Sequence, residues 1–159
     1  MTDTLVIGLG NPILTDDAAG ILAAHALRDA LPPDAGVDVV EAAVGGLPLM
    51  ELMIGYRRVI LVDAVMLPDR GPGEVIVFTA GDLPTTLNSA SSHTTDLPTA
   101  LSTGRQLGAP LPRNADIQVV GIQAQDVLTF SETPTPPVAE AIPRAANMVL
   151  SLLGYSPGD

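Results

Sequence analysis

The sequence predicts a three-layer α/β/α fold, in which a five-stranded, mostly parallel twisted sheet lies between helices on both faces. Short β-branched runs alternate along the chain with longer stretches of helical pattern, which is typical of layered α/β domains. The 159 residues are 47% hydrophobic, which is enough for one well-buried core. We therefore expect residues 1–159 to form a single domain.

Five runs have the length and composition of strands, and three of them are apolar enough to lie at the centre of the sheet. In chain order the predicted strands are Leu5–Gly8, Val37–Glu41, Val59–Asp63, Glu74–Phe78 and Ile117–Ile122. The linker AVMLPDRGP has no helical period, whereas a parallel return needs a crossover of roughly a dozen residues or more. The fourth strand should therefore run antiparallel.

Four stretches are predicted to be helical, the first of them preceded by aspartates and ended by the segment LPPDAG. The predicted helices are Ala18–Leu31, Leu47–Tyr56, Thr95–Leu107 and Val138–Leu153. The segment Ala80–Pro98 is rich in Ser, Thr, Pro and Gly and has no apolar period. It is predicted to be a long loop, and loops of that length are usually functional or mobile.

The charge balance excludes several classes of function. The chain has a net charge of -11, and its seven cationic residues are scattered arginines. We therefore expect no nucleic-acid partner and no membrane partner, and a protein or a small cation fits better. Cysteine is absent, so any metal must be held by oxygen or imidazole ligands. The start MTDTLVIGLG lacks the features of a signal peptide or a membrane span, and we expect a cytoplasmic protein.

The segment GLGNPI has the first two glycines of a dinucleotide-binding fingerprint. Ile13 occupies the position of the third glycine, and the helix begins with Asp16 and Asp17, which would repel a pyrophosphate. Glu41 does end the second strand, where a ribose-binding acid would lie. The acidic helix start nevertheless argues against nucleotide binding.

Two interpretations of the segment TDDAAG remain open. In the first, Thr15 or Asp16 caps the helix and Asp17 lies in its first turn, where the helix dipole favours an acid. In the second, Asp17 is a ligand. The carboxyl ends of adjacent strands one and three flank the crevice where open α/β sheets bind ligands, so Asp17 and Asp63 would face one crevice.

Asp63 and His93 add weight to the ligand interpretation. Asp63 ends the strand RVILVDA, where a solvated strand end or a loop cap is the alternative, and His93 could be an ordinary surface histidine. With Asp17 they supply two carboxylates and an imidazole, which suit Ni²⁺ or Zn²⁺ with open coordination positions. Metal affinity should then fall below about pH 6 as the imidazole is protonated. His25 lies mid-helix between alanines and is interpreted as structural.

These residues resemble those of the endopeptidases that mature nickel–iron hydrogenases, and the resemblance covers nearly the whole chain. The segment GLGNPILTDDAAG is similar to the family's opening motif and gives Asp17, preceded by Asp16, as the first acid. LVDAV resembles the strand of the second acid, Asp63, and SSHTTDLP resembles the histidine segment, with His93. VVGIQAQDVLTFSETPTPPVAEAI is similar to the last strand and final helix of the family.

The resemblance implies a protease that removes the C-terminal extension of a hydrogenase large-subunit precursor after nickel insertion. Asp17, Asp63 and His93 would contact Ni²⁺ carried by the precursor, and Zn²⁺ or Cd²⁺ would substitute for it in crystals. A divalent cation offsets the repulsion of two carboxylates and can polarise a peptide carbonyl. Asp16, Asp17 and Asp63 are the catalytic candidates, and a metal-bound water is an equal contender for activating the attack.

One loop departs from the family pattern. After the second strand the family has an acid, two glycines and a threonine, whereas this chain has EAAVGG, from Glu41 to Gly46. Glu41 is therefore a weaker candidate than the three ligands. We interpret Gly45 and Gly46 as a displaced version of the turn, and the register of the substrate could differ there.

Two alternatives come from other classes of protein. The segment VIGLGNP also resembles the start of bacterial peptidyl-tRNA hydrolase, but LTDDAAG replaces the stretch that carries the catalytic histidine of that family. The other alternative is a nonproteolytic, nickel-dependent checkpoint or chaperone for the same precursor. The same three ligands would serve a protease and a checkpoint equally well.

Overall fold

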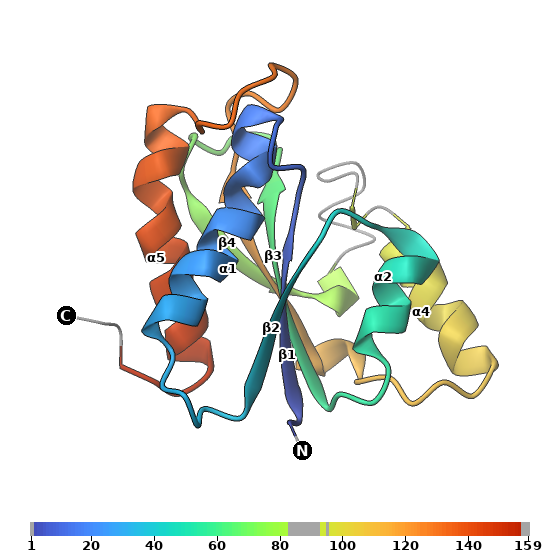
Figure 1. Cartoon of the computed structure of the whole chain (residues 1–159). Coiled ribbons are helices and arrows are strands. Elements are labelled where there is room, and N and C mark those ends of the chain that lie inside the picture. The colour runs from blue at the N-terminus through green and yellow to red at the C-terminus, as the bar shows by residue number, and fades with distance from the viewer. Residues whose placement is uncertain (1, 83–92, 95, 157–159) are drawn as a thin grey trace.

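A computed structural model describes residues 2–82, 93–94 and 96–156 of the chain. Its sheet has five strands in the order β2-β1-β3-β5-β4 (Figure 1). The strands are β1 (Thr4–Leu9), β2 (Val37–Ala42), β3 (Arg58–Val65), β4 (Val75–Thr79) and β5 (Ile117–Gln123). All five predicted strands are present, with ends that differ from the prediction by at most two residues.

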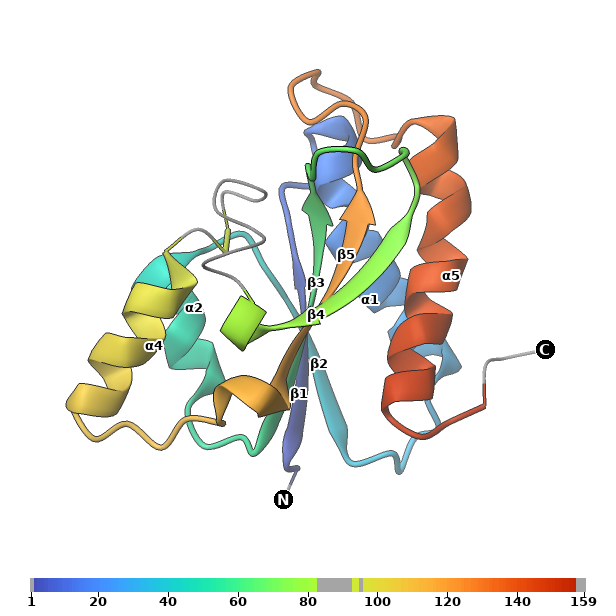
Figure 2. The same cartoon turned by 180° about the vertical axis from the view of Figure 1, so that it is seen from behind.

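The direction of the fourth strand is confirmed. β1 pairs in parallel with β2 and β3, and β3 pairs in parallel with β5. β4 pairs antiparallel with β5, with Val77 opposite Val120, and lies at the edge of the sheet (Figure 2). The chain thus reverses after β3 without a crossover helix, because the short linker does not allow one.

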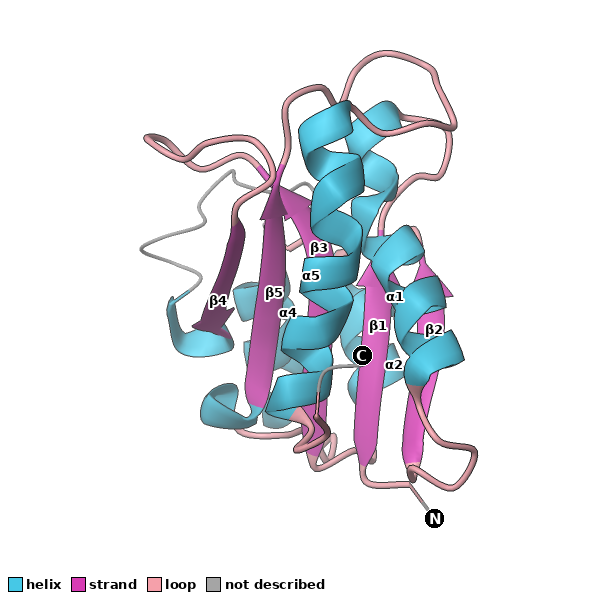
Figure 3. Ribbon diagram, turned by 90° about the vertical axis from the view of Figure 1, so that its left-hand side faces the viewer, coloured by secondary structure: helices cyan, strands magenta, loops and turns pink. Residues whose placement is uncertain are grey.

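The described residues contain four helices of eight residues or more, and they cover both faces of the sheet (Figure 3). They are α1 (Ala19–Ala30), α2 (Gly46–Met53), α4 (Leu97–Gln106) and α5 (Pro136–Leu152). One apolar cluster joins the sheet to α1 and α5, and a second joins it to α2 and α4. The predicted three-layer α/β/α fold is therefore confirmed. β1, β3 and β5 are buried between the two helical layers, which explains their continuous apolar sequences.

Short 3₁₀ turns are the main difference from the predicted elements. They are η1 (Thr15–Ala18), η2 (Ala80–Asp82) and η3 (Asn114–Asp116). The predicted loop Ala80–Pro98 therefore begins with a 3₁₀ turn and ends inside α4, while residues 83–92 and 95 lie outside the described residues. None of the described helices is long and apolar enough to cross a membrane.

Candidate metal-binding site

Two of the three predicted ligands lie at the carboxyl ends of the parallel strands, and the third comes from the segment before α4. Asp17 is in η1, the first element after β1, and Asp63 is on β3 opposite Gly121 of β5. β3 continues two residues past Asp63, which is fully buried, so a solvated strand end is wrong for this residue. His93 precedes α4 and is also buried.

The structure brings these three side chains together. One ligand atom from each of Asp17, Asp63 and His93 lies within 4.8 Å of the others. His93 Nε2 is 3.4 Å from Asp17 Oδ2. The side chains of His93 and Asp17 are 10% and 16% exposed, so the cluster is recessed but reachable from solvent. Two carboxylates and an imidazole at this spacing make a candidate metal site, with oxygen and nitrogen ligands that suit Ni²⁺ or Zn²⁺.

The glycine turn after β1 orients Asp17. The backbone N–H of Asn11 donates to Asp17 Oδ2 over 3.0 Å. A Cβ on Gly10 would lie 2.0 Å from the backbone oxygen of Asp17, so only glycine allows this approach. The GLGN turn therefore holds a carboxylate of its own chain, in the place where a nucleotide-binding protein would hold a phosphate.

The acids of the site shift the titration of His93. The hydrogen bond with Asp17 raises the pKa of His93 above its ordinary value of about 6.5, and the charges of Asp63 and Asp17 act in the same direction. Burial of the ring acts the other way and is outweighed. The metal-free site therefore favours a protonated imidazole, which must lose its proton before the nitrogen can bind a metal.

We expect metal affinity and stability to respond to pH in opposite directions. Zn²⁺ affinity should fall as the pH drops through the raised pKa of His93, so the loss begins at a higher pH than the value of about 6 predicted from sequence. In the metal-free protein, protonated His93 should contribute stability that is fully present below about pH 6.5. This contribution is lost as the pH rises through the folded-state pKa.

Calorimetric Zn²⁺ titrations and thermal melts at several pH values test both effects. In His93→Ala, the pH dependence of Zn²⁺ affinity and the pH dependence of stability should both weaken. Zn²⁺ affinity that stays constant from about pH 8 to about pH 6 would contradict the assignment of His93 as a ligand.

Asp16 has a different environment from its neighbour Asp17. Its side chain is fully buried and accepts hydrogen bonds from the backbone N–H groups of Gln125, Asp126 and Thr135, at 2.8, 2.9 and 2.7 Å. The hydroxyl of Thr135 donates to both of its carboxylate oxygens. Asp16 thus connects η1 to the loop between β5 and α5 and to the residue that precedes α5.

The helix-cap interpretation of TDDAAG is wrong. Neither η1 nor α1 has a side-chain cap, although Asp17 does lie in the first turn of η1, which runs directly into α1 at Ala19. The hydroxyl of Thr15 donates to the backbone oxygen of Thr129. Thr15 and Asp16 bind the distant β5–α5 loop, and their side chains are therefore turned away from the N–H groups that open α1.

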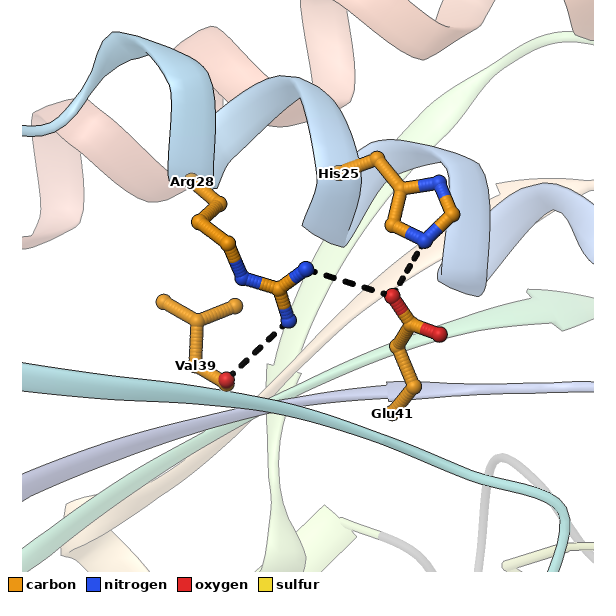
Figure 4. Close-up of polar contacts among 4 residues, drawn as sticks. All are labelled: His25, Arg28, Val39 and Glu41. Atoms are coloured by element: carbon orange, nitrogen blue, oxygen red, sulfur yellow. Dashed lines mark hydrogen bonds and ion pairs between the residues drawn. The ribbon is translucent and has the colours of Figure 1, made fainter.

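Glu41 lies outside the cluster. Its Oε1 pairs with His25 Nε2 and lies 3.4 Å from Arg28 Nη1, while Arg28 Nη2 donates to the backbone oxygen of Val39 (Figure 4). These contacts join α1 to the edge strand β2. They support the structural interpretation of His25 and explain why Glu41 is not available to the metal-binding cluster.

The loop with Gly45 and Gly46, which we interpreted from sequence as a displaced glycine turn, lies against the backbone of His93. A Cβ on Gly45 would lie 2.7 Å from the backbone oxygen of His93 and 3.2 Å from its Cα. The loop after β2 therefore packs directly on the backbone of a candidate ligand. Gly46, with φ +56, opens α2 immediately afterwards.

Gly45→Ala should therefore weaken metal binding by displacing the His93 segment. The backbone of Gly45 is extended and suits alanine, so steric contact with His93 is the reason for the effect. We expect Zn²⁺ affinity to fall roughly 10-fold or more, the scale seen for residues that orient metal ligands. Gly71→Ala is the control, because a Cβ there meets only Glu74 Oε2, at 3.7 Å. Equal Zn²⁺ affinity in the two variants would contradict this role of Gly45.

Asn11 and Thr135 are the residues of the site that sequence reasoning missed. Asn11 contributes its backbone N–H, which every residue except proline carries, so residue type gave no signal. Thr135 directly precedes Pro136, the first residue of α5, and this is a recognisable helix-start pattern. That pattern predicts where the helix begins but not that Thr135 binds Asp16.

The fold and the site together define a metal-binding α/β protein, with its candidate ligands at the carboxyl edge of a mixed sheet. Residues 21–152 match the family described as hydrogenase maturation protease, and the chain belongs to this family. This membership decides against the peptidyl-tRNA hydrolase alternative.

Known relatives cover nearly the whole chain. It is 28% identical over 153 residues to the hydrogenase 2 maturation protease of Escherichia coli K12, a match that covers 96% of this chain and 91% of the relative. The solved structure of the hydrogenase maturating endopeptidase HybD from E. coli superimposes with a TM-score of 0.80 at 29% identity, covering 97% of this chain and 93% of HybD. A hydrogenase maturation protease HybD from Thermococcus kodakarensis shares the fold, with a TM-score of 0.76 at 24% identity over 96% of this chain and 99% of the other.

Proposed function

We propose that this chain is the endopeptidase that removes the C-terminal extension of a nickel–iron hydrogenase large-subunit precursor after nickel insertion. The observation that carries the proposal is the convergence of Asp17, Asp63 and His93 within 4.8 Å, in a chain that belongs to the hydrogenase maturation proteases. These three groups would recognise nickel that arrives on the precursor. Zn²⁺ and Cd²⁺ have similar ligand preferences and can serve as probes.

The charge of the site supports recognition of a cation. Two carboxylates that share one recess repel each other, and a divalent ion offsets this repulsion. The same ion can polarise a neighbouring peptide carbonyl or lower the pKa of a bound water. A precursor without nickel brings no such charge, so the site would discriminate between loaded and unloaded precursor.

The contacts of Asp16, Asp17 and Asp63 suggest a different role for Asp16 than for the other two acids. Asp17 is partly exposed and Asp63 fully buried, and both belong to the cluster. We assign the contact with nickel to these two acids. The water that attacks the peptide bond would be activated either by one of them or by binding to the metal itself. Asp16 is a positioning residue in this proposal, because the chain itself already occupies both of its oxygens.

The scope of the proposal follows the sequence predictions. We propose that residues 1–159 act as a single hydrogenase-maturation-protease-like domain and that its partner is the large-subunit precursor. The absence of cysteine is compatible with the cytoplasmic location predicted from sequence.

Intact-mass measurement tests the proposal. Nickel-loaded precursor incubated with the protein should lose the mass of its C-terminal extension, and nickel-free precursor should not. A stable complex with precursor of unchanged mass would favour the nonproteolytic checkpoint instead. Such a result would contradict the endopeptidase assignment while leaving the role of the metal cluster intact.

A further inference from the structure

The loop between β5 and α5 exposes two large apolar side chains. Leu128 and Phe130 are 84% and 78% exposed, and among the described residues only Leu107, at 83%, is comparable. Single exposed apolar residues are common on protein surfaces and need no explanation. The loop that carries Leu128 and Phe130 differs because it is held in one shape and lies beside the metal cluster.

Hydrogen bonds fix this loop at several points. Asp126 Oδ1 accepts from the backbone N–H groups of Leu128 and Thr129, at 2.9 and 3.0 Å. The backbone N–H of Ser131 donates to the backbone oxygen of Ile13 over 2.9 Å, and the backbone N–H of Thr15 donates to the backbone oxygen of Ser131 over 3.0 Å. Asp16 binds the start of the loop, as described above. A loop ordered in advance loses little conformational entropy when a partner binds it.

The same turn holds the loop and the metal site. Thr15 and Asp16 bind the loop, and Asp17, the next residue, belongs to the metal cluster. Leu128 is two residues beyond Asp126, whose backbone nitrogen lies 2.9 Å from Asp16 Oδ2. The lengths of the chain and of this hydrogen bond therefore keep the backbone of Leu128 within about 20 Å of the backbone of Asp17. Figure 1 shows the loop, in orange, above the N-terminal end of α1.

The size of a stable interface decides what covers this surface. A standard protein interface buries about 800 Å² on each partner, which corresponds to a patch reaching about 16 Å from its centre. A precursor interface of this size that is centred between Asp17 and the loop therefore covers both the metal cluster and the two exposed side chains. The neighbouring Asp126 and Glu132 are acidic, and the whole chain is strongly acidic, so the opposing surface should carry neutral or basic groups.

We propose that Leu128 and Phe130 form a docking anchor that enters an apolar recess on the nickel-loaded precursor, rimmed by neutral or basic groups. The inference rests on the proposed function, because that function supplies the partner. A few buried side chains, with aromatic residues prominent among them, carry most of the energy of a protein interface. The anchor would supply affinity for the precursor, while the metal cluster decides whether nickel is present.

The double variant Leu128→Ser with Phe130→Ser tests the anchor, and Leu107→Ser is the matched control. Leu107 follows α4 at the end away from His93, roughly 15 Å along a helix of ten residues, and is as exposed as the anchor. For processing of nickel-loaded precursor, the double variant should raise KM at least about 10-fold, with kcat within about twofold. Zn²⁺ affinity and melting temperature should stay at wild-type values, and Leu107→Ser should match the wild type throughout.

Three results would overturn the anchor. The first is a wild-type KM in the double variant, and the second is an equal rise of KM in Leu107→Ser. The third is a wild-type homodimer that the double variant fails to form, since a second copy of the chain would then be what covers Leu128 and Phe130. If the wild type binds the precursor without cutting it, the proposed function is wrong, but the docking anchor can still be tested. The Kd values of the wild type and the two variants for uncut precursor then replace KM.

Discussion

Hydrogenase large-subunit precursor should remain uncut in cells whose only copy of this protein is Asp17→Asn. The substitution replaces a charged ligand with a neutral amide and removes part of the attraction that holds the cation. Loss of a direct ligand should lower the processing rate at least about 10- to 100-fold. Changes of this size in affinity or activity are already seen when a residue that only orients a metal ligand is replaced. The fold should persist, because asparagine retains an oxygen that can accept from the N–H of Asn11.

Processing and stability are measured on the same variant to separate the two effects. Intact-mass analysis of the large subunit should show the retained extension, and the variant should melt cooperatively near the wild-type temperature. The pKa of His93 followed by NMR should move down toward about 6.5, because the hydrogen bond with the Asp17 carboxylate is the largest contribution that raises it. Asp34→Asn, which removes the same charge at an exposed position, is the control. Trimmed subunit appearing at the normal rate would mean that Asp17 does not recognise the metal.

The sheet could be predicted from sequence because its strands have few alternatives. β1, β3 and β5 lie between two helical layers, so most of the side chains on them are apolar. The linker after β3 fixed the direction of β4 by its length alone. The 3₁₀ turn η1 was missed because a single turn of four residues has no apolar period to detect.

The metal cluster was predictable to the extent that it depends on topology. Asp17 follows β1 and Asp63 lies near the carboxyl end of the adjacent strand β3, so their convergence comes from strand order. His93 has no such constraint. Its residue type and its place in the polar loop made it a candidate, and the similarity of its segment to a known family supported the assignment. The cap interpretation of Asp16 failed because its partners Gln125, Asp126 and Thr135 are 109 to 119 residues away, and no local pattern reports contacts at that distance.

The contacts of Asp16 also predict a large loss of stability when its carboxylate is removed. Asp16→Ala would leave three backbone N–H groups and the Thr135 hydroxyl without their acceptor at a fully buried position. A single unsatisfied buried donor costs about 1 to 3 kcal/mol, so we expect the free energy of unfolding to fall by about 3 kcal/mol or more. For a chain of this length that corresponds to a melting temperature lower by roughly 6 to 12 °C.

Asp16→Asn provides the sharper comparison, because the same chemical change is made one residue before Asp17→Asn. An asparagine at position 16 keeps the shape of the side chain but directs an NH₂ group at donors that need an acceptor, so it should still destabilise the protein. Thermal and urea unfolding should therefore separate the two neighbours, with Asp16→Asn clearly less stable and Asp17→Asn close to the wild type. In Asp16→Asn the processing rate should fall because the β5–α5 loop and η1 lose their connection, while added Zn²⁺ should still bind at low temperature, where the fold persists. Equal melting temperatures for Asp16→Asn and the wild type, combined with lost processing, would show instead that Asp16 belongs to the catalytic acids.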